Sequence, residues 1–567
     1  MKATNQKKQH IIQLAFSVII LVLLGYISTR VFFRVDLTSE KRYTLSEETK
    51  HIASKLEDVA YVKVYLEGEL PAGFKKFRNA IRETLDEMKI YAKDNIQYEF
   101  INPSENPDEQ TRNKIYTELA QKGLKPTNIK MRDKEGGESE KMIFPGAIVS
   151  YQGMEFPIQL LKNNAGLSAD ENLNNSIQNI EYEITRALYT VSSKQVTKIS
   201  FVEGHGELTE PEVNDIMLSL SNYQIDRGVI NGTPGILDPY KAVIIAKPTK
   251  PFSEQDKLVI DQYIMHGGNV LWLVDGVNVN TDSLANGYSF GFVNNINLDD
   301  QLFTYGVRVN PDLVMDIQCN ILPVQAGMNG DKPRWVPAPW LYYPLISPLV
   351  NHQITRDLNL VWARFASVVD TITGNNEVKK TFLLLSSAQT KVVNAPVMIR
   401  LDEVKHNPVR EEFNKQNQPI AVLLEGPFRS VFRNRDVGKI IPQVAGNYKA
   451  SGVPSKMIVV ADGDMIANDI KVTPQGTMVT ALGYDKYTRQ TFGNKEFLVN
   501  AINYLADESG LLSLRSKDLK LRLLDKKRIR DEKVKWQVIN TVLPVVVIIG
   551  FGLVFNRYRR KRYGKTA

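Results

Sequence analysis

The sequence KAVIIAKPTKPFSEQDKLVIDQYIMHGGNVLWLV (241–274) contains two short apolar runs separated by a segment of helical composition. The runs 241–246 and 269–274 are almost continuously apolar, as in strands that are buried on both faces of a sheet. Between them, Ser253 is a suitable helix N-cap, and the pair Gly267-Gly268 marks the end of that helix. This order predicts two parallel strands joined by a helix that covers one face of the sheet.

Similar runs flank this unit on both sides. KISFV (198–202) precedes it, and KMIVVA (456–461) lies far downstream. Repeated β-α-β units predict a parallel sheet with helices on both faces, and we therefore expect a larger α/β domain over residues 197–510. A less regular insertion is expected around residues 284–366. The order of strand, Pro-rich loop, helix and strand resembles the class I glutamine-amidotransferase-like fold, so this domain is expected to be amidotransferase-like.

A smaller α/β domain is predicted over residues 36–165. Its first elements are the strand AYVKVYL (60–66), a helix over 74–92 and the strand IQYEFI (96–101). Together with later strands, this order predicts a thioredoxin-like domain. The loop after its first strand contains no cysteine, which excludes thiol–disulfide chemistry there. A linker helix over residues 166–196 is expected to join the two domains.

An uncharged stretch near the C-terminus, WQVINTVLPVVVIIGFGLVF (536–555), is long enough to span a membrane. Twenty residues of helix measure about 30 Å, the thickness of the hydrocarbon core. A buried helix of a soluble domain is the alternative, but basic residues follow the stretch immediately. We predict a transmembrane helix over 536–555, followed by a basic cytoplasmic tail over 556–567.

A second apolar stretch, IIQLAFSVIILVLLGYIS (11–28), follows Lys2, Lys7 and Lys8. A cleaved signal peptide is the alternative, but the run is long and no small-x-small cleavage site follows it. We predict a transmembrane helix over 11–29, preceded by a cytoplasmic N-terminus over 1–10.

Two membrane spans place both termini on one side and the bulk of the chain on the other. The positive-inside rule assigns the termini to the cytoplasm and the folded domains to the opposite side of the membrane. The juxtamembrane segment 511–535 opposes this assignment, because it contains ten Lys/Arg against four Asp/Glu. In that segment, Lys526, Lys527 and Arg528 are predicted contacts with anionic lipid or with a partner; a basic stalk is the alternative.

The composition excludes several classes of function. The formal net charge of +8 comes from the basic ends, so the folded part is mildly acidic and no nucleic-acid binding is expected. Cys319 is the only cysteine, and the six histidines include no HExxH motif or close pair. We therefore predict no disulfide, no metal site, no cofactor and no catalytic residue. The chain also lacks a Walker A sequence and is not expected to hydrolyse ATP.

A small set of residues is a candidate ligand or partner surface. The stretch Arg334–Pro344 carries four aromatic side chains, and aromatic rings supply much contact area in binding sites. A Pro-rigidified loop packed on the domain is the alternative reading. His205 lies between two glycines at the end of a predicted strand, and Asp462 and Asp464 are expected to serve as a turn and helix cap. The surface is predicted to include His205, Trp335, Trp340 and Tyr343.

Several stretches together resemble one family, the gliding-motility-associated ABC transporter accessory ("substrate-binding") proteins of the GldG type. The stretches are VDLTSEKRYTLSEETK (35–50), FVEGHGELTE (201–210), IAVLLEGPFRSVFRNR (420–435), VVADGDMI (459–466), FGNKEFLVNAINYLADESGLLSLRSKDLKLRLLDKKR (492–528) and KWQVIN (535–540). The resemblance covers nearly the whole chain. It implies an auxiliary subunit that works with a separate ABC permease and ABC ATPase, and it supplies no catalytic or ligand residues.

The resemblance implies a non-catalytic extracytoplasmic auxiliary subunit of an ABC transporter involved in gliding motility, located in the bacterial inner membrane with the bulk of the chain in the periplasm. Its expected partners are the permease, the ATPase, membrane lipid and periplasmic motility or secretion components. Two alternatives stay open at this point. One is a scaffold that binds no small molecule, and the other is a degenerate amidotransferase-like enzyme that uses His205, Asp462 or Cys319.

Overall fold

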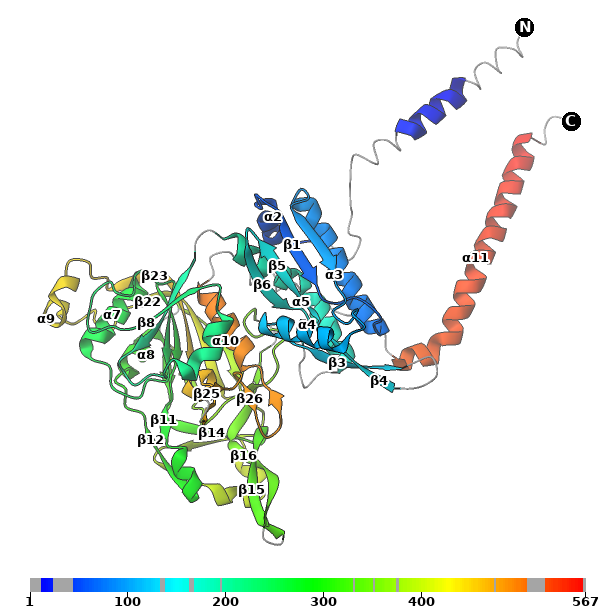
Figure 1. The fold of residues 1–567 in the computed structure, drawn as a ribbon. Helices are drawn as coiled ribbons and strands as arrows, with labels where there is room; N and C mark the ends of the chain where they lie inside the picture. Colours follow the sequence, from blue (N-terminus) through cyan, green and yellow to red (C-terminus); the bar gives the residue numbers. More distant parts are fainter. Residues whose placement is uncertain are drawn as a thin grey trace. The chain divides into compact units, whose positions relative to one another are not determined.

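The computed structural model describes residues 12–23, 44–132, 138–162, 168–193, 196–329, 332–349, 352–373, 377–473, 476–506 and 526–563. The chain divides into two compact units, Met1–Lys517 and Asp518–Ala567. The first unit holds two α/β regions, each built around its own sheet, and the second holds one long helix (Figure 1).

The larger sheet combines a parallel half and an antiparallel half. Its strand order is β15-β16-β19-β22-β23-β10-β9-β7-β8, and β17 pairs with β16 beside this path. Neighbours from β23 to β8 run parallel, as predicted, whereas the pairs from β15 to β23 run antiparallel. The strands are β7 (Lys198–Glu203), β8 (Gln224–Val229), β9 (Ala242–Ala246), β10 (Asn269–Leu273), β15 (Cys319–Asn329), β16 (Lys332–Pro348), β17 (Val361–Trp362), β19 (Lys379–Leu385), β22 (Pro419–Arg429) and β23 (Ser451–Val460).

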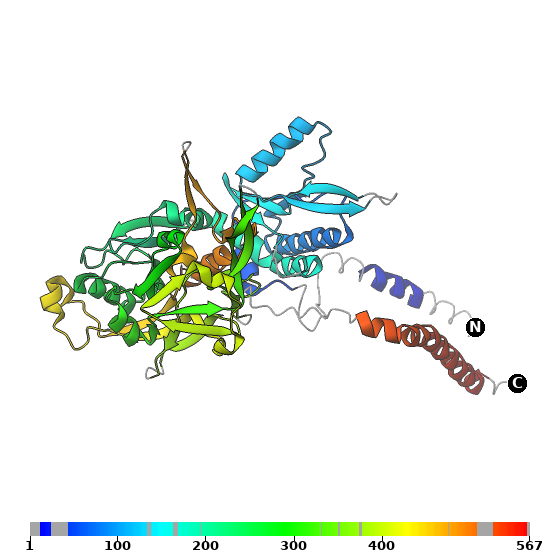
Figure 2. The same cartoon turned by 90° about the horizontal axis from the view of Figure 1, so that it is seen from below.

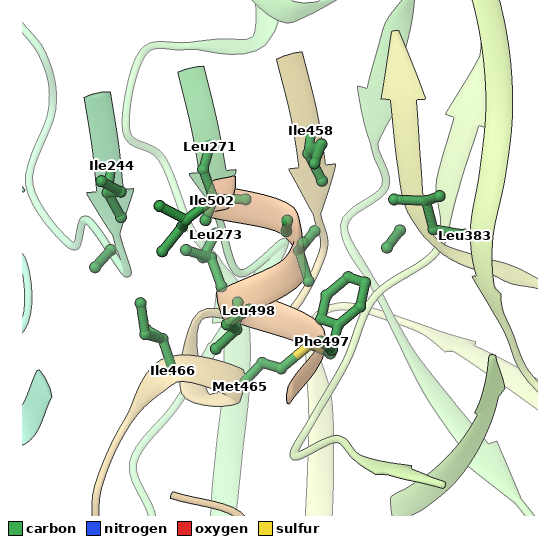
Figure 3. Close-up of a cluster of buried hydrophobic side chains, with 14 of the residues drawn as sticks. Ile244, Leu271, Leu273, Leu383, Ile458, Met465, Ile466, Phe497, Leu498 and Ile502 are labelled. Carbon is green, nitrogen blue, oxygen red and sulfur yellow. The ribbon is translucent and has the colours of Figure 1, made fainter. Parts of the chain in front are cut away.

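The central strands bury side chains on both faces because successive residues of a strand point in opposite directions. In β9, Ile244 joins one hydrophobic core and Ile245 joins the other. Helix α10 (Asn494–Ala506) packs on the first face, where Figure 3 shows Phe497 and its neighbours beside the ends of the strands. The opposite face is covered by α7 (Glu254–Met265) and α8 (Asp299–Tyr305). Ser253 caps α7 by accepting a hydrogen bond from the amide of Asp256, as predicted.

The region 284–366 is more regular than predicted. It contains the paired strands β15 and β16, which run out from the sheet as a long hairpin (Figure 1). The prolines of β16 suggested a loop, but proline is compatible with extended backbone near a sheet edge, and β15 supplies the pairing partner. Three smaller sheets combine strands from this region with strands that flank it. The first contains β11 (Val277–Val279), β12 (Tyr288–Val293) and β21 (Val397–Arg400). The other two pair β13 (Val307–Val309) with β18 (Val369–Thr371), and β14 (Asp312–Asp316) with β20 (Thr390–Asn394).

The N-terminal α/β region has a four-stranded sheet in the order β2-β1-β5-β6. Strands β1 and β2 are parallel, while β5 is antiparallel to β1 and β6. Its elements are α2 (Glu47–Ser54), β1 (Ala60–Val64), α3 (Ala72–Tyr91), β2 (Ile96–Phe100), α4 (Glu109–Gln121), the hairpin of β3 (Thr127–Arg132) and β4 (Glu138–Ile143), β5 (Gly146–Tyr151), β6 (Met154–Gln159) and α5 (Ala169–Ser192).

Helix α5 differs from the linker helix predicted over 166–196. It buries Ile180, Ile184 and Leu188 in the same core as β1 and β5, and it lies beside α3 (Figure 2). The helix begins at Ala169, within the predicted range. Ser168 and Glu171 form a capping box, which satisfies backbone donors of the first turn. The segment is therefore part of the N-terminal hydrophobic core.

The second unit contains α11 (Lys526–Tyr563), a single helix that continues on both sides of the predicted span 536–555. Within the described part of the chain, its section Asp531–Lys561 is the one helix long and apolar enough to cross a membrane, with a mean hydropathy of 2.5 over its most apolar stretch. None of that stretch is buried in protein. A shorter apolar helix, Ile12–Leu23, covers part of the predicted span 11–29, and the rest of that span lies outside the described residues.

Candidate functional site

The charged residues that follow three neighbouring parallel strands meet at one edge of the larger sheet. Lys247 follows β9, Asp275 lies two residues beyond β10, and Asp462 and Asp464 follow β23. Because these strands are adjacent and parallel, their carboxyl ends lie at the same edge, where α/β proteins usually bind ligands. We call these four residues the carboxyl-edge cluster.

One ammonium group and three carboxylates interact in this cluster. Lys247 Nζ lies 2.5 Å from Asp464 Oδ1 and 3.8 Å from Asp275 Oδ2. The backbone of Lys247 has a φ of +56°, a left-handed conformation that residues other than glycine rarely adopt. Carboxylate oxygens of all three aspartates lie within 4.8 Å of one another. Lys247 therefore supplies positive charge where three negative groups converge.

The aspartates also organise the loop after β23. Asp462 Oδ1 accepts a hydrogen bond from the Asp464 amide at 2.8 Å, so it caps the short helix η6 (Gly463–Ile466), as predicted. Asp275 Oδ1 accepts from the Gly463 amide at 2.5 Å. A Cβ atom on Gly463 would lie 2.6 Å from Lys247 Cγ, so glycine is needed for this close approach. The cluster thus has a structural role in joining the three loops.

Burial changes the protonation of these groups. It raises the pKa of Asp275 to about 6, although the Lys247 ammonium opposes the change. Burial, together with repulsion from Asp464 and Asp275, raises the pKa of Asp462 well above its ordinary value. Burial alone disfavours the charged form of Lys247, but the attraction of Asp275 and Asp464 outweighs it and raises the lysine pKa. The site can therefore take up protons at mildly acidic pH.

Two further side chains lie beside the cluster. The Arg364 amide donates to Asp462 Oδ2 at 2.8 Å, while its guanidinium pairs with Asp469 at 2.8 Å. Burial raises the pKa of Tyr343 to about 12, and the charges of Arg364 and Asp464 also act on this hydroxyl. Asp275 also lines a groove of about 660 Å³, together with residues that include Asn294 and Phe303.

His205 is held by its neighbours and has little exposed surface. Its ring is stacked on Phe252 with a centroid distance of 3.7 Å. The two ring nitrogens lie 3.1 Å from carboxylate oxygens of Glu207 and Asp256. Burial disfavours the charged imidazole, but the hydrogen bonds to Glu207 and Asp256 outweigh this effect and raise the pKa of His205. These contacts stabilise the loop after β7.

That loop fills the place where a doubly wound sheet would open a crevice. Strand β8 lies on one side of β7 and β9 on the other, so the chain reverses direction across the sheet here. The His205 carbonyl accepts hydrogen bonds from the amides of Thr249 and Lys250 at 2.9 and 2.8 Å. A Cβ atom on Gly206, which has a φ of +75°, would lie 2.2 Å from Thr249 Oγ1. Backbone and His205 therefore occupy the space between the two loops.

The predicted aromatic surface is divided by the structure. Trp335 is 59% exposed on β16, whereas Trp340 is only 1% exposed and belongs to a hydrophobic core. Tyr343 is half-buried, and its ring lies 5.3 Å from that of Phe365. Since alternate residues of a strand face opposite sides, spacing along β16 separates Trp335 from Trp340. Of the predicted residues, Tyr343 lies near the carboxyl-edge cluster and Trp335 faces solvent.

Cys319 has the properties of an unreactive thiol. It is partly buried at the start of β15, and burial raises its pKa to about 12. Since the thiolate is the nucleophile, a thiol of this kind is almost fully protonated at neutral pH.

The predicted basic contacts Lys526, Lys527 and Arg528 form the first turn of α11, and their side chains lie outside the described residues. Lys247 and Asp275 are central to the carboxyl-edge cluster, but sequence reasoning did not select them. The available signal was their position directly after two buried strands, which predicts a shared edge.

Comparison with known proteins finds one family, one further domain and one full-length relative that are similar to this chain. Residues 197–501 match the family described as "ABC-type uncharacterized transport system", and residues 39–150 match a domain of unknown function. An uncharacterized protein from Borreliella burgdorferi is 21% identical over 586 residues, which cover 98% of this chain and 99% of that protein.

Two solved structures are also similar to parts of the chain. The N-terminal domain of mmIFT52 has a TM-score of 0.31 and 15% identity, over 55% of this chain and 97% of that one. A ThuA-like protein from Parabacteroides merdae has a TM-score of 0.26 and 10% identity, over 55% of this chain and 90% of that one.

The fold and the long apolar helix define a mixed α/β protein with a candidate membrane anchor. The family match extends over more than half of the 567 residues, and the chain belongs to the ABC-type transport system family as a transport-associated accessory protein. Membership of that family suggests a permease and an ATPase as partners.

Proposed function

We propose that the chain is a non-catalytic extracytoplasmic auxiliary subunit of an ABC transporter in the bacterial inner membrane. The observation that carries this proposal is α11. Its apolar section, Asp531–Lys561, is not covered by protein, and burying so much apolar surface in lipid is strongly favourable. Together with membership of an ABC transport family, an unburied span of this kind supports an anchored accessory subunit.

The chemistry of the larger domain supports a non-catalytic role. Both ring nitrogens of His205 face carboxylates, and the pKa of Cys319 is raised to about 12. The groups expected of a degenerate amidotransferase-like enzyme are therefore engaged or unreactive. The strand order β2-β1-β5-β6 of the N-terminal region supports the description of that region as a thioredoxin-like scaffold without cysteines.

In this proposal both termini are cytoplasmic and the bulk of the chain is periplasmic. Basic residues at the two ends support this topology. Single cysteines in a Cys319→Ser background test it. A membrane-impermeant maleimide should label Lys439→Cys, at a side chain that is 84% exposed, in intact spheroplasts. It should label Lys565→Cys only after lysis. The reverse labelling pattern would indicate the opposite topology. Labelling of both cysteines in intact spheroplasts would exclude the proposed topology.

The resemblance to gliding-motility accessory proteins supports a role in bacterial gliding. In such a complex, the periplasmic domains bind a ligand or a motility or secretion component, and the permease and ATPase work at the membrane. Trp335 is a candidate partner contact because it is exposed at a projecting hairpin. Lys526, Lys527 and Arg528 are candidate contacts with anionic lipid.

Purification of the tagged full-length protein in mild detergent tests the partnership. We expect a multi-span permease and a Walker-motif ATPase to co-purify with the intact chain. Deletion of 536–555 should abolish their recovery. A third variant, in which an unrelated apolar span of equal length replaces 536–555, separates anchoring from specific helix recognition. Recovery of neither partner with the intact chain contradicts the proposal.

A further inference from the structure

A ladder of aromatic side chains occupies the outer face of the small sheet formed by β11, β12 and β21. Tyr288, Phe290 and Phe292 alternate along β12 and are 53%, 46% and 59% exposed. The ring centroids of Tyr288 and Phe290 are 5.9 Å apart, and those of Phe290 and Phe292 are 6.1 Å apart. Contiguous apolar side chains exposed on one face are a common feature of binding surfaces.

The inner face of the same sheet keeps the ladder facing outward. Ser289 and Gly291, which lie between the aromatic residues, point toward a core that contains Val277 and Ile399. A Cβ atom on Gly291 would lie 2.9 Å from the side chain of Val277, so no larger residue fits without rearrangement. A slip of one residue would place the rings in this tight space, and the register of β12 is therefore strongly specified. The ring planes of Phe290 and Phe292 are 28° apart, whereas the Tyr288 ring stands at 83° to that of Phe290; we call this outer surface of β12 the aromatic platform.

A groove of about 630 Å³ lies along this platform and has an uncharged polar rim. The polar groups are the amides of Asn278, Asn280 and Asn286 and the hydroxyl of Ser283. Asn278 is opposite Phe292 in the pairing of β11 with β12. No side chain among the described residues that line the groove carries a charge.

This combination restricts the chemistry of the ligand. A lipid surface or a phosphate group selects lysine and arginine, which do not line the groove. Arg400, which is opposite Tyr288 on β21, forms an ion pair with Asp402 at 2.9 Å. Flat apolar rings beside amide donors and acceptors suit a molecule that has both C–H faces and many hydroxyl groups. Pyranose rings have this character, because C–H bonds cover their faces and hydroxyl groups surround their edges. The amides satisfy hydroxyl groups that would otherwise lose hydrogen bonds to water.

We propose that the groove along β12 binds a neutral oligosaccharide, with the faces of Phe290 and Phe292 against successive sugar units and the Tyr288 ring edge-on beside them. Asn278 and Asn286 donate and accept hydrogen bonds at the rim of the groove. This inference does not depend on the proposed transport role, because the groove is formed entirely by the larger α/β domain.

The test uses the full-length protein in detergent micelles and a broad array of neutral and acidic glycans, followed by calorimetry with the neutral oligosaccharide that binds best. We expect Phe290→Ala and Phe292→Ala each to weaken binding at least tenfold, while Phe290→Trp retains it. Phe303→Ala is the matched control, because Phe303 is 53% exposed and lies outside the groove. It should bind as the unmodified protein does.

Four results would overturn the assignment. They are failure of every neutral glycan to bind, preference for acidic glycans, equal binding by Phe292→Ala, and binding of unstructured peptides through these rings in place of glycans. Thermal unfolding of each variant shows that it is folded. The side chains being replaced are exposed, so we expect little change in stability. Loss of permease recovery without loss of glycan binding would concern the transport role alone.

Discussion

The Lys247 ammonium lies 2.5 Å from the Asp464 carboxylate, and this contact joins loops that follow β9 and β23 on either side of β10. The same ammonium group faces Asp275 at 3.8 Å. A single side chain thus connects the ends of three parallel strands at the edge where α/β folds usually bind ligands. In this protein, internal ion pairs of Lys247 with Asp464 and Asp275 lie at that edge.

Removing that cation should destabilise the larger domain. Lys247→Met leaves the three aspartates without the positive charge that offsets their burial, and we expect a loss of about 3 kcal/mol in the free energy of unfolding at pH 7. Lys439→Met is the control, because its pair with Asp436 is exposed and should contribute little. Denaturant unfolding of both variants provides the comparison. Equal, small effects would show that the cluster does not join the loops.

Asp312 should make stability depend on pH. Burial raises its pKa to about 6 in the folded protein, while its ordinary value is 3.8. Because the folded-state pKa is the higher one, the contribution is fully present below pH 3.8 and is lost as the pH rises through about 6. The loss corresponds to about 3 kcal/mol as an order of magnitude.

The variant Asp312→Asn tests this titration. Its amide oxygen can still accept the hydrogen bond that the Val368 amide donates to Asp312 at 2.9 Å. We expect this variant to gain stability relative to the unmodified protein at pH 7 and to lose that advantage near pH 4. Unfolding curves at a series of pH values measure the difference. A constant difference across the pH range would contradict the predicted titration of Asp312.

Replacing Trp340 should lower stability much more than replacing Trp335, although both residues lie on β16. Trp340→Ala removes a side chain that is 1% exposed and should cost about 3–5 kcal/mol of stability. Trp335→Ala removes one that is 59% exposed and should leave stability nearly unchanged. Thermal unfolding compares the two. If Trp335 contacts a partner, its replacement should reduce recovery of that partner at unchanged stability; unchanged recovery would remove Trp335 from the partner surface.

A double variant, His205→Gln with Cys319→Ser, distinguishes an accessory subunit from a degenerate enzyme. We expect lower stability, because glutamine cannot reproduce both contacts of the imidazole with Glu207 and Asp256. Recovery of the permease and ATPase should nevertheless persist at a permissive temperature, and under the proposed role in gliding so should motility. Loss of motility in a folded, fully assembled variant would indicate that one of these side chains performs chemistry.

The sequence predicted secondary structure best where the local pattern of apolar and capping residues agrees with the packing in the folded domain. The apolar runs of β9 and β10 and the Ser253 cap predicted a strand, a helix and a parallel strand, and the structure confirms all three. The strand β16 was missed because its prolines are typical of loops, and its pairing with β15 is not visible in local sequence. Helix α5 lies within the range predicted for a linker helix, and Ser168 and Glu171 form its capping box, but its burial in the N-terminal core was missed because a linker helix and a core helix can share one apolar pattern.

Functional surfaces were harder to predict than elements. Alternation in YSFGFV (288–293) indicates a strand, but the period alone does not say which face is exposed. In the structure the aromatic residues face outward and Ser289 and Gly291 face inward, the reverse of the usual arrangement. Trp340 was selected for its chemistry, and only tertiary packing shows that it is part of a core.

Reciprocal purification tests the central claim most directly. A tag on the ATPase that co-purifies with this protein should recover the permease and the accessory chain together, at a fixed ratio to one another through size-exclusion chromatography in detergent. The ratio should persist when the aromatic platform is altered by Phe292→Ala. Recovery of ATPase and permease without the accessory chain, under conditions in which α11 is intact, would contradict its role as a subunit of the transporter.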